Sequence, residues 1–258
     1  MSTTEIARPE APAVAEPAAR VEHLVKRFGS GPVVLDDVSL QVAPGEFVCL
    51  IGASGCGKST LLALLAGLER PTSGTASVAG GRAGLMFQES ALLPWLTAAG
   101  NVELALRLSG TGRKERQQEA RRLLALVRLE DSAVLRPHEL SGGMRQRVAL
   151  ARALAQRTPV LLMDEPFGAL DAITRDVLHE ELVRVWRETG VSVVFVTHNV
   201  REAVKLGQRI LLLSSRPGRI IHSWDVDLTD RRLESPPVAA LAAEITDRLR
   251  AEIRRHAA

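Results

Sequence analysis

The chain has 258 residues, of which 46% are hydrophobic and 24% are charged, and its formal net charge is +3. These proportions are typical of a soluble globular protein and exclude a collagen-like or largely disordered chain. The small basic excess does not indicate a nucleic-acid partner, and the two cysteines are too few for a disulfide framework and point to a reducing compartment.

The first predicted elements follow a low-complexity start. Residues 1–20 are rich in alanine, proline and glutamate and lack the basic and apolar regions of a secretory signal, so we expect a disordered tail. From Val21 onward, apolar runs such as 33–35 and 47–51 alternate with glycine and proline turns and predict strands. The run 47–51 leads into a glycine-rich stretch and a helical pattern over 59–69, a strand-loop-helix unit typical of a parallel sheet.

The glycine-rich stretch at residues 52–59 reads GASGCGKS and matches the pattern G-x-x-x-x-G-K-S. In such a loop the glycines let backbone N–H groups turn inward and hold phosphate oxygens at a helix N-terminus. Lys58 is then placed to neutralise the β and γ phosphates, and Ser59 to coordinate Mg²⁺. The residues predicted to bind nucleotide here are Gly52, Ser54, Gly55, Cys56, Gly57, Lys58, Ser59 and Thr60.

Strand patterns disappear between residues 89 and 157 and return afterwards. The intervening segment has helical periodicity over 98–108, 113–129 and 142–155, which predicts an inserted helical subdomain. Apolar runs then predict strands at 160–164, 191–197 and 210–214, a helix at 172–189, a short segment at 220–226 and a helix from about residue 237. No apolar run reaches the roughly 20 residues of a membrane-spanning helix.

Two carboxylates follow the apolar strand that begins at Val160. Asp164 ends this strand, where it can hold the shell of a Mg²⁺ ion, and Glu165 comes next, where it can polarise a water as a general base. A phosphate loop alone also occurs in kinases, GTPases and motors, so the reaction must be inferred from these carboxylates. A lone Asp-Glu pair is more often a solvated turn, but the strand context and the upstream phosphate loop favour the catalytic interpretation.

The run 140–147 reads LSGGMRQR and opens a helix, with Ser141 as its N-cap. The phosphate loop, LSGGM, LLMDEP, Gly168-Ala-Leu-Asp171 and Thr197-His198 occur in the order found in ABC transporter ATPase subunits, which the chain resembles over about residues 21–228. The resemblance implies a P-loop NTPase (RecA-like) α/β core with an antiparallel β portion and an inserted α-helical subdomain. It also implies ATP and Mg²⁺ as cofactors.

The resemblance assigns roles to further residues. Gln88 matches the Q-loop glutamine, which contacts Mg²⁺ and the attacking water, and His198 matches the switch histidine that contacts the γ-phosphate. Asp171 matches the D-loop aspartate. Phe28 lies where the family places an aromatic that stacks on adenine, although a core position for Phe28 stays open. The signature residues expected to bind the partner subunit's nucleotide are Ser141, Gly142 and Gly143.

Two residues depart from the usual family pattern. Met144 stands where many members have glutamine, which puts in doubt a hydrogen bond near the ribose. Cys56 lies inside the phosphate loop beside Lys58, and we expect a lowered thiol pKa and inhibition by thiol reagents, with ATP protecting. Cys49, in the preceding strand, is expected to be a small buried hydrophobe.

The resemblance also predicts how the chain is divided and assembled. Its ATPase domain would cover residues 21–230, with a core of 21–88 and 158–230, a helical subdomain of about 89–157 and a helical extension of 231–258. We expect a homodimer in which each signature closes over ATP held by the other subunit. The homodimer would lie on the cytoplasmic face of the cell membrane as a peripheral protein, without nucleic acid.

The resemblance implies further partners. Two membrane permease subunits would dock on the region from Gln88 to Val102, where Trp95 is either a docking residue or a core residue. The full complex would include a periplasmic or lipid-anchored solute-binding protein. The helix at the C-terminal end is expected to pack on its own domain rather than on lipid.

The segments 165–171, Leu93-Pro-Trp-Leu-Thr97 and Ser215-Arg-Pro-Gly-Arg-Ile220 resemble the nitrate/sulfonate/taurine branch of bacterial importers. Within this branch we favour import of aliphatic sulfonates, with nitrate, taurine or a related small solute as the alternative. A more remote alternative is a non-transport ABC ATPase that acts on nucleic acid, although the chain lacks the coiled coils, second ATPase domain or zinc modules of such proteins. A P-loop small-molecule kinase would not need the signature.

Overall fold

The computed structural model describes residues 16–228, 231 and 235–257. The predicted tail therefore lies outside the described residues apart from 16–20, and its predicted end is wrong. Ala19 already belongs to the first strand, where it pairs with Val42 on one side and with Val78 on the other.

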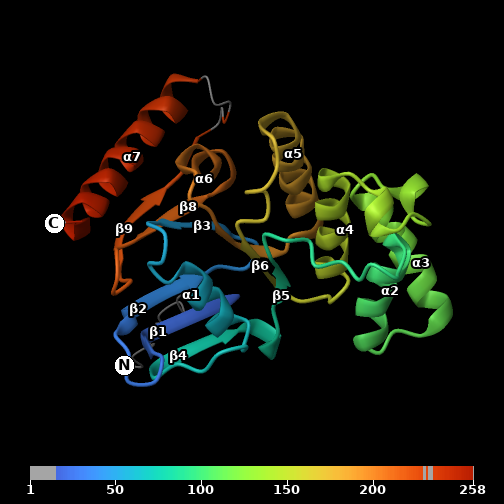
Figure 1. Ribbon diagram of the computed structural model, residues 1–258, viewed down its shortest axis with the longest axis horizontal. Coiled ribbons are helices and arrows are strands. Elements are labelled where there is room, and N and C mark those ends of the chain that lie inside the picture. The colour runs from blue at the N-terminus through green and yellow to red at the C-terminus, as the bar shows by residue number, and fades with distance from the viewer. Residues whose placement is uncertain (1–15, 229–230, 232–234, 258) are drawn as a thin grey trace, which may run out of the picture.

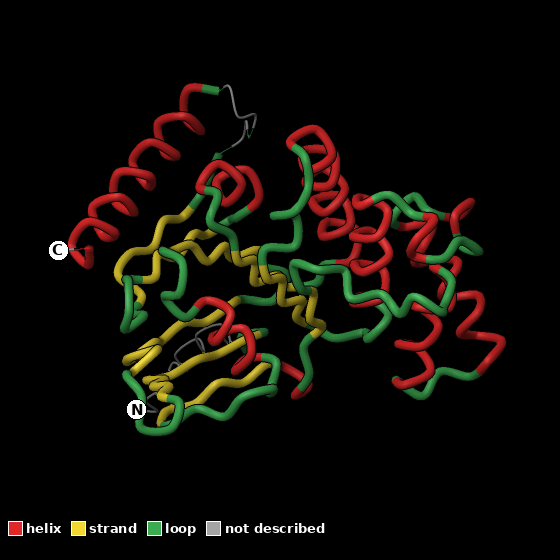
Figure 2. The backbone as a smooth tube through the Cα atoms, viewed as in Figure 1, coloured by secondary structure: helices red, strands yellow, loops and turns green. Residues whose placement is uncertain are grey.

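A six-stranded sheet forms the centre of the molecule (Figures 1 and 2). Its strands, in spatial order, are β5 (Gly84–Met86), β6 (Val160–Asp164), β7 (Ser192–Val196), β3 (Phe47–Gly52), β8 (Arg209–Leu213) and β9 (Ile220–Asp225). All neighbouring pairs are parallel except β8 and β9, which are antiparallel. The predicted parallel sheet is thus confirmed, and the carboxyl ends of β3, β6, β7 and β8 share one edge, where ligands bind in such folds.

Side chains of the central strands alternate between two cores. On β3, Phe47, Cys49 and Ile51 face the core that the helices complete, whereas Val48 and Leu50 face the core on the other side of the sheet. Because both faces of the sheet are covered, its strands are continuous apolar runs. Cys49 is fully buried, as the sequence predicted.

The second core is closed by a three-stranded antiparallel sheet and one helix. The strands are β2 (Val33–Val42), β1 (Ala19–Arg27) and β4 (Ser73–Val78), in that order. Helix α1 (Lys58–Leu65) contributes buried leucines to the same core (Figure 1). The prediction for this helix ran to residue 69, but the helix ends at Leu65 because Gly67 adopts a left-handed φ of 70°.

Three helices between β5 and β6, together called the helical subdomain below, project from the β5–β6 edge of the sheet (Figure 1). Its helices are α2 (Ala98–Leu108), α3 (Arg113–Leu126) and α4 (Gly142–Leu154). Thr97 and Ser141 cap α2 and α4 by accepting hydrogen bonds from backbone N–H groups of their first turns. Helix α3 ends before its predicted limit at 129, and Arg128 follows with a left-handed φ of 54°.

Three further helices complete the fold. Helix α5 (Ala172–Thr189) has its predicted bounds, and α7 (Pro236–Ala257) begins one residue before its expected start. Helix α6 (Val200–Leu206) is a short element without a sequence prediction. Short 3₁₀ turns lie at Ala79–Gly81, Glu130–Ser132 and Pro137–Glu139. None of the described helices combines the length and the apolar composition needed to cross a bilayer.

Candidate active site

The glycine-rich loop joins the carboxyl end of β3 to the start of α1. Lys58 Nζ reaches back over the loop and donates hydrogen bonds to the carbonyl oxygens of Gly52 and Ala53, each at 2.9 Å. Gly57 has a φ of 106°, and a Cβ at this position would lie 2.7 Å from Leu35 Cδ2. Both backbone conformation and space therefore require glycine here.

A cavity of about 500 Å³ opens beside this loop. The predicted loop residues that line it are Ser54, Gly55, Gly57, Lys58, Ser59 and Thr60. Phe28, Glu165 and Arg216 line the same cavity. One concave site therefore unites cationic, hydroxyl, carboxylate and aromatic groups from separate parts of the chain.

Phe28 presents its ring to this cavity and is 47% exposed, which contradicts the alternative of a core position. Lys26 Nζ lies 4.5 Å from the ring centroid and is itself held by the Glu69 carboxylate and the Arg70 carbonyl, both at 2.8 Å. The ring is thus positioned by a buried cation and remains accessible to a planar ligand.

Cys56 differs from its prediction. Its side chain is 1% exposed and packs under the loop among the apolar residues of the second core. Burial raises the pKa of the Cys56 thiol, and the nearby Lys58 charge offsets this only in part. The expected low pKa was wrong because the sequence shows Lys58 close by but cannot show that the thiol points into the core.

Asp164 lies within hydrogen-bond distance of Ser59, which lines the cavity. Burial raises the pKa of Asp164, the neighbouring Glu165 charge adds to this, and a hydrogen bond with Ser59 acts in the opposite direction. A partly buried carboxylate beside a hydroxyl is the donor set that Mg²⁺ prefers. The residues present therefore fit the predicted ion, which would also relieve the charge cost of burying Asp164.

Glu165 follows β6 in a left-handed conformation with a φ of 44°, uncommon for a residue other than glycine. Its Oε2 shares a hydrogen bond of 2.9 Å with His198 Nδ1. Gln88 approaches the same place, since a Cβ built on Gly168 would lie 3.2 Å from Gln88 Nε2 and 3.7 Å from Glu165 Oε2. The structure therefore brings together Glu165, His198 and Gln88 from three separate loops.

The signature residues do not join this site within one chain. Helices α1 and α4 lie on separate parts of the molecule in Figure 1. Ser141 Oγ accepts a hydrogen bond of 3.2 Å from Met144 N, and a Cβ on Gly143 would lie 2.8 Å from Thr174 Cγ2. Gly143 therefore allows α4 to pack closely against α5, in addition to any contact with nucleotide.

Met144, which replaces the usual glutamine, is partly buried against the helical core. Asp171 caps α5 by accepting a hydrogen bond of 3.0 Å from Thr174 N. Hydrogen bonds to the Asp171 carboxylate, first among them the one from the Thr174 backbone N–H, lower the pKa of Asp171. Asp171 thus has a structural function within its own chain.

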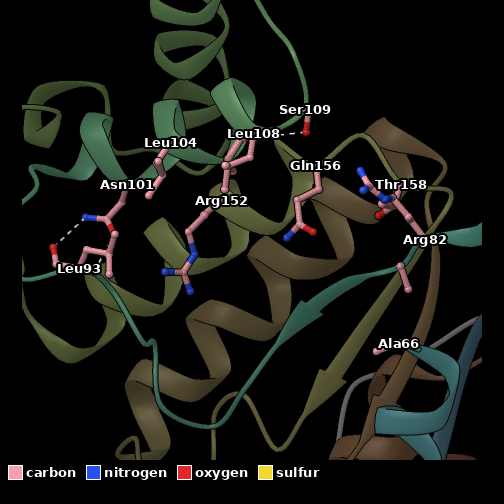
Figure 3. A pocket seen from close by; sticks show the side chains of 12 residues that line it. Ala66, Arg82, Leu93, Asn101, Leu104, Leu108, Ser109, Arg152, Gln156 and Thr158 are labelled. Carbon is pink, nitrogen blue, oxygen red and sulfur yellow. Dashed lines mark hydrogen bonds between the residues drawn. The ribbon is translucent and has the colours of Figure 1, made fainter. Parts of the chain in front are cut away.

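A second cavity of about 600 Å³ lies between the helical subdomain and the sheet edge (Figure 3). Arg152 of α4 donates hydrogen bonds to the carbonyls of Ser90 and Ala91 at 2.8 and 2.6 Å, and Asn101 accepts one from Leu93 N at 2.8 Å. Trp95 follows on this tethered segment and is 68% exposed. The alternative that Trp95 is a core residue is therefore wrong.

Sequence reasoning missed two polar residues near the active site. Arg216 lines the cavity beside the phosphate loop, and the only hint was its place in the Ser215-Arg-Pro-Gly segment. Gln146 of α4 is 5% exposed and its Nε2 donates a hydrogen bond of 2.7 Å to the Gln88 carbonyl. The sequence could not indicate either contact, because both depend on how the elements pack.

Comparisons of the sequence and of the structure with known proteins point to one family. Residues 35–168 match the family described as ABC transporter. The chain is 49% identical over 217 residues to the taurine import ATP-binding protein TauB of Burkholderia pseudomallei, covering 81% of this chain and 84% of that protein. It is 49% identical over 203 residues to the nitrate import ATP-binding protein NrtD of Synechocystis sp., covering 76% of each.

Among solved structures, a dimer of the ATP-binding cassette MJ0796 bound to ADP and Pi is similar. The TM-score is 0.70 with 33% sequence identity, over 81% of this chain and 99% of that one.

Proposed function

This chain belongs to the ABC transporter ATP-binding family, and on that premise we propose that it energises import of small aliphatic sulfonates through separate membrane permeases. As a member of this family the chain binds ATP and is an ATPase of the importer type. The transported solute, the residues that act and the details of assembly form the proposal.

The observation that carries the catalytic proposal is the pairing of Glu165 with His198 beside the phosphate loop. Lys58 and the loop bind the phosphates of ATP, and the Phe28 ring stacks on adenine. Ser59, Asp164 and Gln88 would hold Mg²⁺, which would supply charge neutralisation at the phosphates. Glu165 Oε accepts the proton of the attacking water, while the hydrogen bond to His198 holds the carboxylate in place.

The arrangement of the signature supports the proposal of a working dimer. Ser141, Gly142 and Gly143 are remote from the phosphate loop of their own chain, so a second copy is needed to bring a signature to each ATP. ATP binding then closes the dimer and hydrolysis reopens it. We assign residues 19–88 and 158–230 to the ATPase core, which begins with β1, 89–157 to the helical subdomain and 231–258 to an extension.

The cavity of Figure 3 is the proposed docking site for one permease subunit, so that the homodimer binds two. It is lined by the tethered segment near Leu93 and by apolar residues of α2 such as Leu104 and Leu108. Trp95 beside it supplies an exposed aromatic anchor. This docking places the chain as a peripheral protein on the cytoplasmic face of the membrane, with a solute-binding protein completing the transporter on the other side.

Docking can be tested by copurification. Replacing Trp95 with alanine should lower the amount of permease that copurifies with the chain several-fold, because the anchor loses most of its apolar contact area. Val134, an exposed hydrophobic residue of the same subdomain that does not line the cavity, provides the matched control Val134→Ala. Equal recovery with Trp95→Ala and Val134→Ala would contradict the assignment.

The solute is inferred from the relatives. Taurine, named for one relative, is an aliphatic aminosulfonate, and nitrate, named for another, is likewise a small oxyanion. Aliphatic sulfonates are therefore the proposed solutes, and nitrate or taurine itself is the alternative within the same mechanism.

The decisive experiment replaces the native copy with Glu165→Gln and compares growth on alkanesulfonates and on sulfate as sole sulfur source. We expect growth to fail on sulfonates only, because the base for hydrolysis is lost. Taurine as sulfur source and nitrate as nitrogen source form the other arms. If growth fails only with taurine or only with nitrate, that compound replaces other aliphatic sulfonates as the proposed solute. Normal growth under every condition would overturn the transport function.

A further inference from the structure

The loop of residues 214–219 lies against the phosphate loop because of the strand order. Strands β8 and β3 are parallel neighbours, with Leu213 in register with Gly52. The chain therefore leaves both strands at the same edge, one into the phosphate loop and the other into the loop 214–219. Gly218 packs so closely that a Cβ there would lie 2.3 Å from the Cys56 carbonyl oxygen.

Arg216 carries the only positive charge that this loop gives to the nucleotide cavity. Its Nη2 donates a hydrogen bond of 3.2 Å to the Gly55 carbonyl, and its side chain lines the cavity together with Lys58. Arg219, the other arginine of the loop, donates two hydrogen bonds to the Asp36 carboxylate and does not line the cavity. The Arg216 charge can therefore face an anionic ligand in the cavity, whereas the Arg219 charge is paired with Asp36.

The C-terminal helix fixes the base of the same loop. Glu252 of α7 is 4% exposed, and its Oε1 accepts a hydrogen bond of 3.1 Å from Ser215 N. Ile245 is fully buried and anchors α7 in the helical core. A direct chain of contacts therefore runs from α7 through Glu252 and Ser215 to the residue that reaches the phosphate loop.

We propose that Arg216 is a nucleotide-binding residue and that α7 positions it through Glu252, so the C-terminal helix sets the affinity for ATP. A guanidinium forms strong, charge-assisted hydrogen bonds with phosphate oxygens and suits this position. The inference rests on the proposed function, since it assumes that ATP occupies the cavity beside Lys58. Through Glu252 and Arg216, α7 regulates nucleotide binding at this same site.

The first test is the affinity for ATP, measured by fluorescence titration with N-methylanthraniloyl-ATP and Mg²⁺. The full chain carries Glu165→Gln so that nucleotide is not consumed. Arg216→Ala should weaken binding about five- to tenfold, a reduction that allows for the solvent exposure of the side chain. Arg216→Lys should recover part of the loss, and the matched control Arg219→Ala should bind as the parent does.

The second test is a double-mutant cycle between α7 and the loop. Glu252→Ala should weaken nucleotide binding about threefold in the parent but have no further effect in the Arg216→Ala background, because it acts only through Arg216. Glu252→Gln keeps an acceptor for Ser215 N and should restore affinity, which separates positioning from damage to α7. The midpoint of thermal unfolding confirms that each variant is folded.

The outcomes separate this inference from the proposed function. If Arg216→Ala binds as tightly as the parent while Lys58→Ala loses binding, Arg216 has no part in the site and the proposed function stands. If Lys58→Ala also binds as the parent does, the proposed nucleotide site itself is overturned. Equal losses from Glu252→Ala in both backgrounds would remove the contribution of α7.

Discussion

At the scale of single residues, side-chain direction decides chemistry more than nearness in sequence. Cys56 and Lys58 are two positions apart, yet the thiol faces an apolar core while the ammonium lies over the loop carbonyls. The raised pKa of Cys56 follows from this direction. Glu165 and His198 are far apart in sequence but share a hydrogen bond, because β6 and β7 end side by side.

Cys56 should therefore react slowly with alkylating reagents. The thiolate is the reactive form, and a raised pKa leaves little of it at neutral pH. We expect the rate of alkylation by iodoacetamide, followed by mass spectrometry, to be low at pH 7 and to increase as the pH rises toward the raised pKa. The chain unfolded in guanidinium serves as control and should react faster, and equal rates at pH 7 would contradict the buried position.

The positions of the proposed catalytic residues were predictable from the sequence because their motifs fix both residue type and spacing. The phosphate loop, Asp164, Glu165 and His198 all lie at the carboxyl edge of the sheet, as expected for residues that follow parallel strands. Arg216 was not predictable, because it reaches the site only through the neighbouring positions of β3 and β8.

At the scale of elements, the hydrogen bond from Gln146 to the Gln88 carbonyl joins α4 to the loop that carries Gln88. The other side-chain atom, Gln146 Oε1, is buried without a hydrogen-bond partner. A buried oxygen without a hydrogen-bond partner lowers the free energy of unfolding, because its lost hydration is not replaced. The amide is therefore retained at a cost to stability, which is consistent with a function in holding the two elements together.

Gln146→Glu should reveal this link. A carboxylate oxygen in place of the amide nitrogen would face the Gln88 carbonyl oxygen, and we expect the free energy of unfolding to fall by about 1–3 kcal/mol. ATPase activity should fall as well, since Gln88 would be displaced. Gln117→Glu, at an exposed position on α3, is the matched control in urea denaturation. An unchanged free energy of unfolding for Gln146→Glu would show that the contact is dispensable.

The sequence predicted elements best where an apolar period coincided with a capping residue. Helices α2 and α5 have their predicted bounds, and Thr97 and Asp171 cap them. It did not predict β4, whose residues Ser73–Val78 are mostly small and largely exposed. Its strand conformation comes from pairing with β1, a tertiary interaction that leaves no apolar pattern in the strand itself.

At the scale of the whole molecule, the separation of the signature from the phosphate loop requires a partner. We expect the Glu165→Gln variant with Mg-ATP to form a stable dimer, because ATP is bound but not hydrolysed. Light scattering should give twice the mass of one chain. Adding Ser141→Arg should restore the monomer, since a bulky side chain would block closure, and a strictly monomeric Glu165→Gln variant at saturating ATP would contradict the mechanism.

The helical subdomain leaves the sheet after β5 and returns through β6, and these strands are paired neighbours with Met86 in register with Met163. Because the two strands are parallel, the chain leaves at the carboxyl end of β5 and re-enters at the amino end of β6, so the two ends of the insertion lie on neighbouring strands but at opposite ends of the pair. The inserted subdomain can therefore be exchanged between related proteins as one continuous segment. The subdomain of a relative should be graftable at these two seams, without altering the order of the strands that carry the proposed catalytic residues.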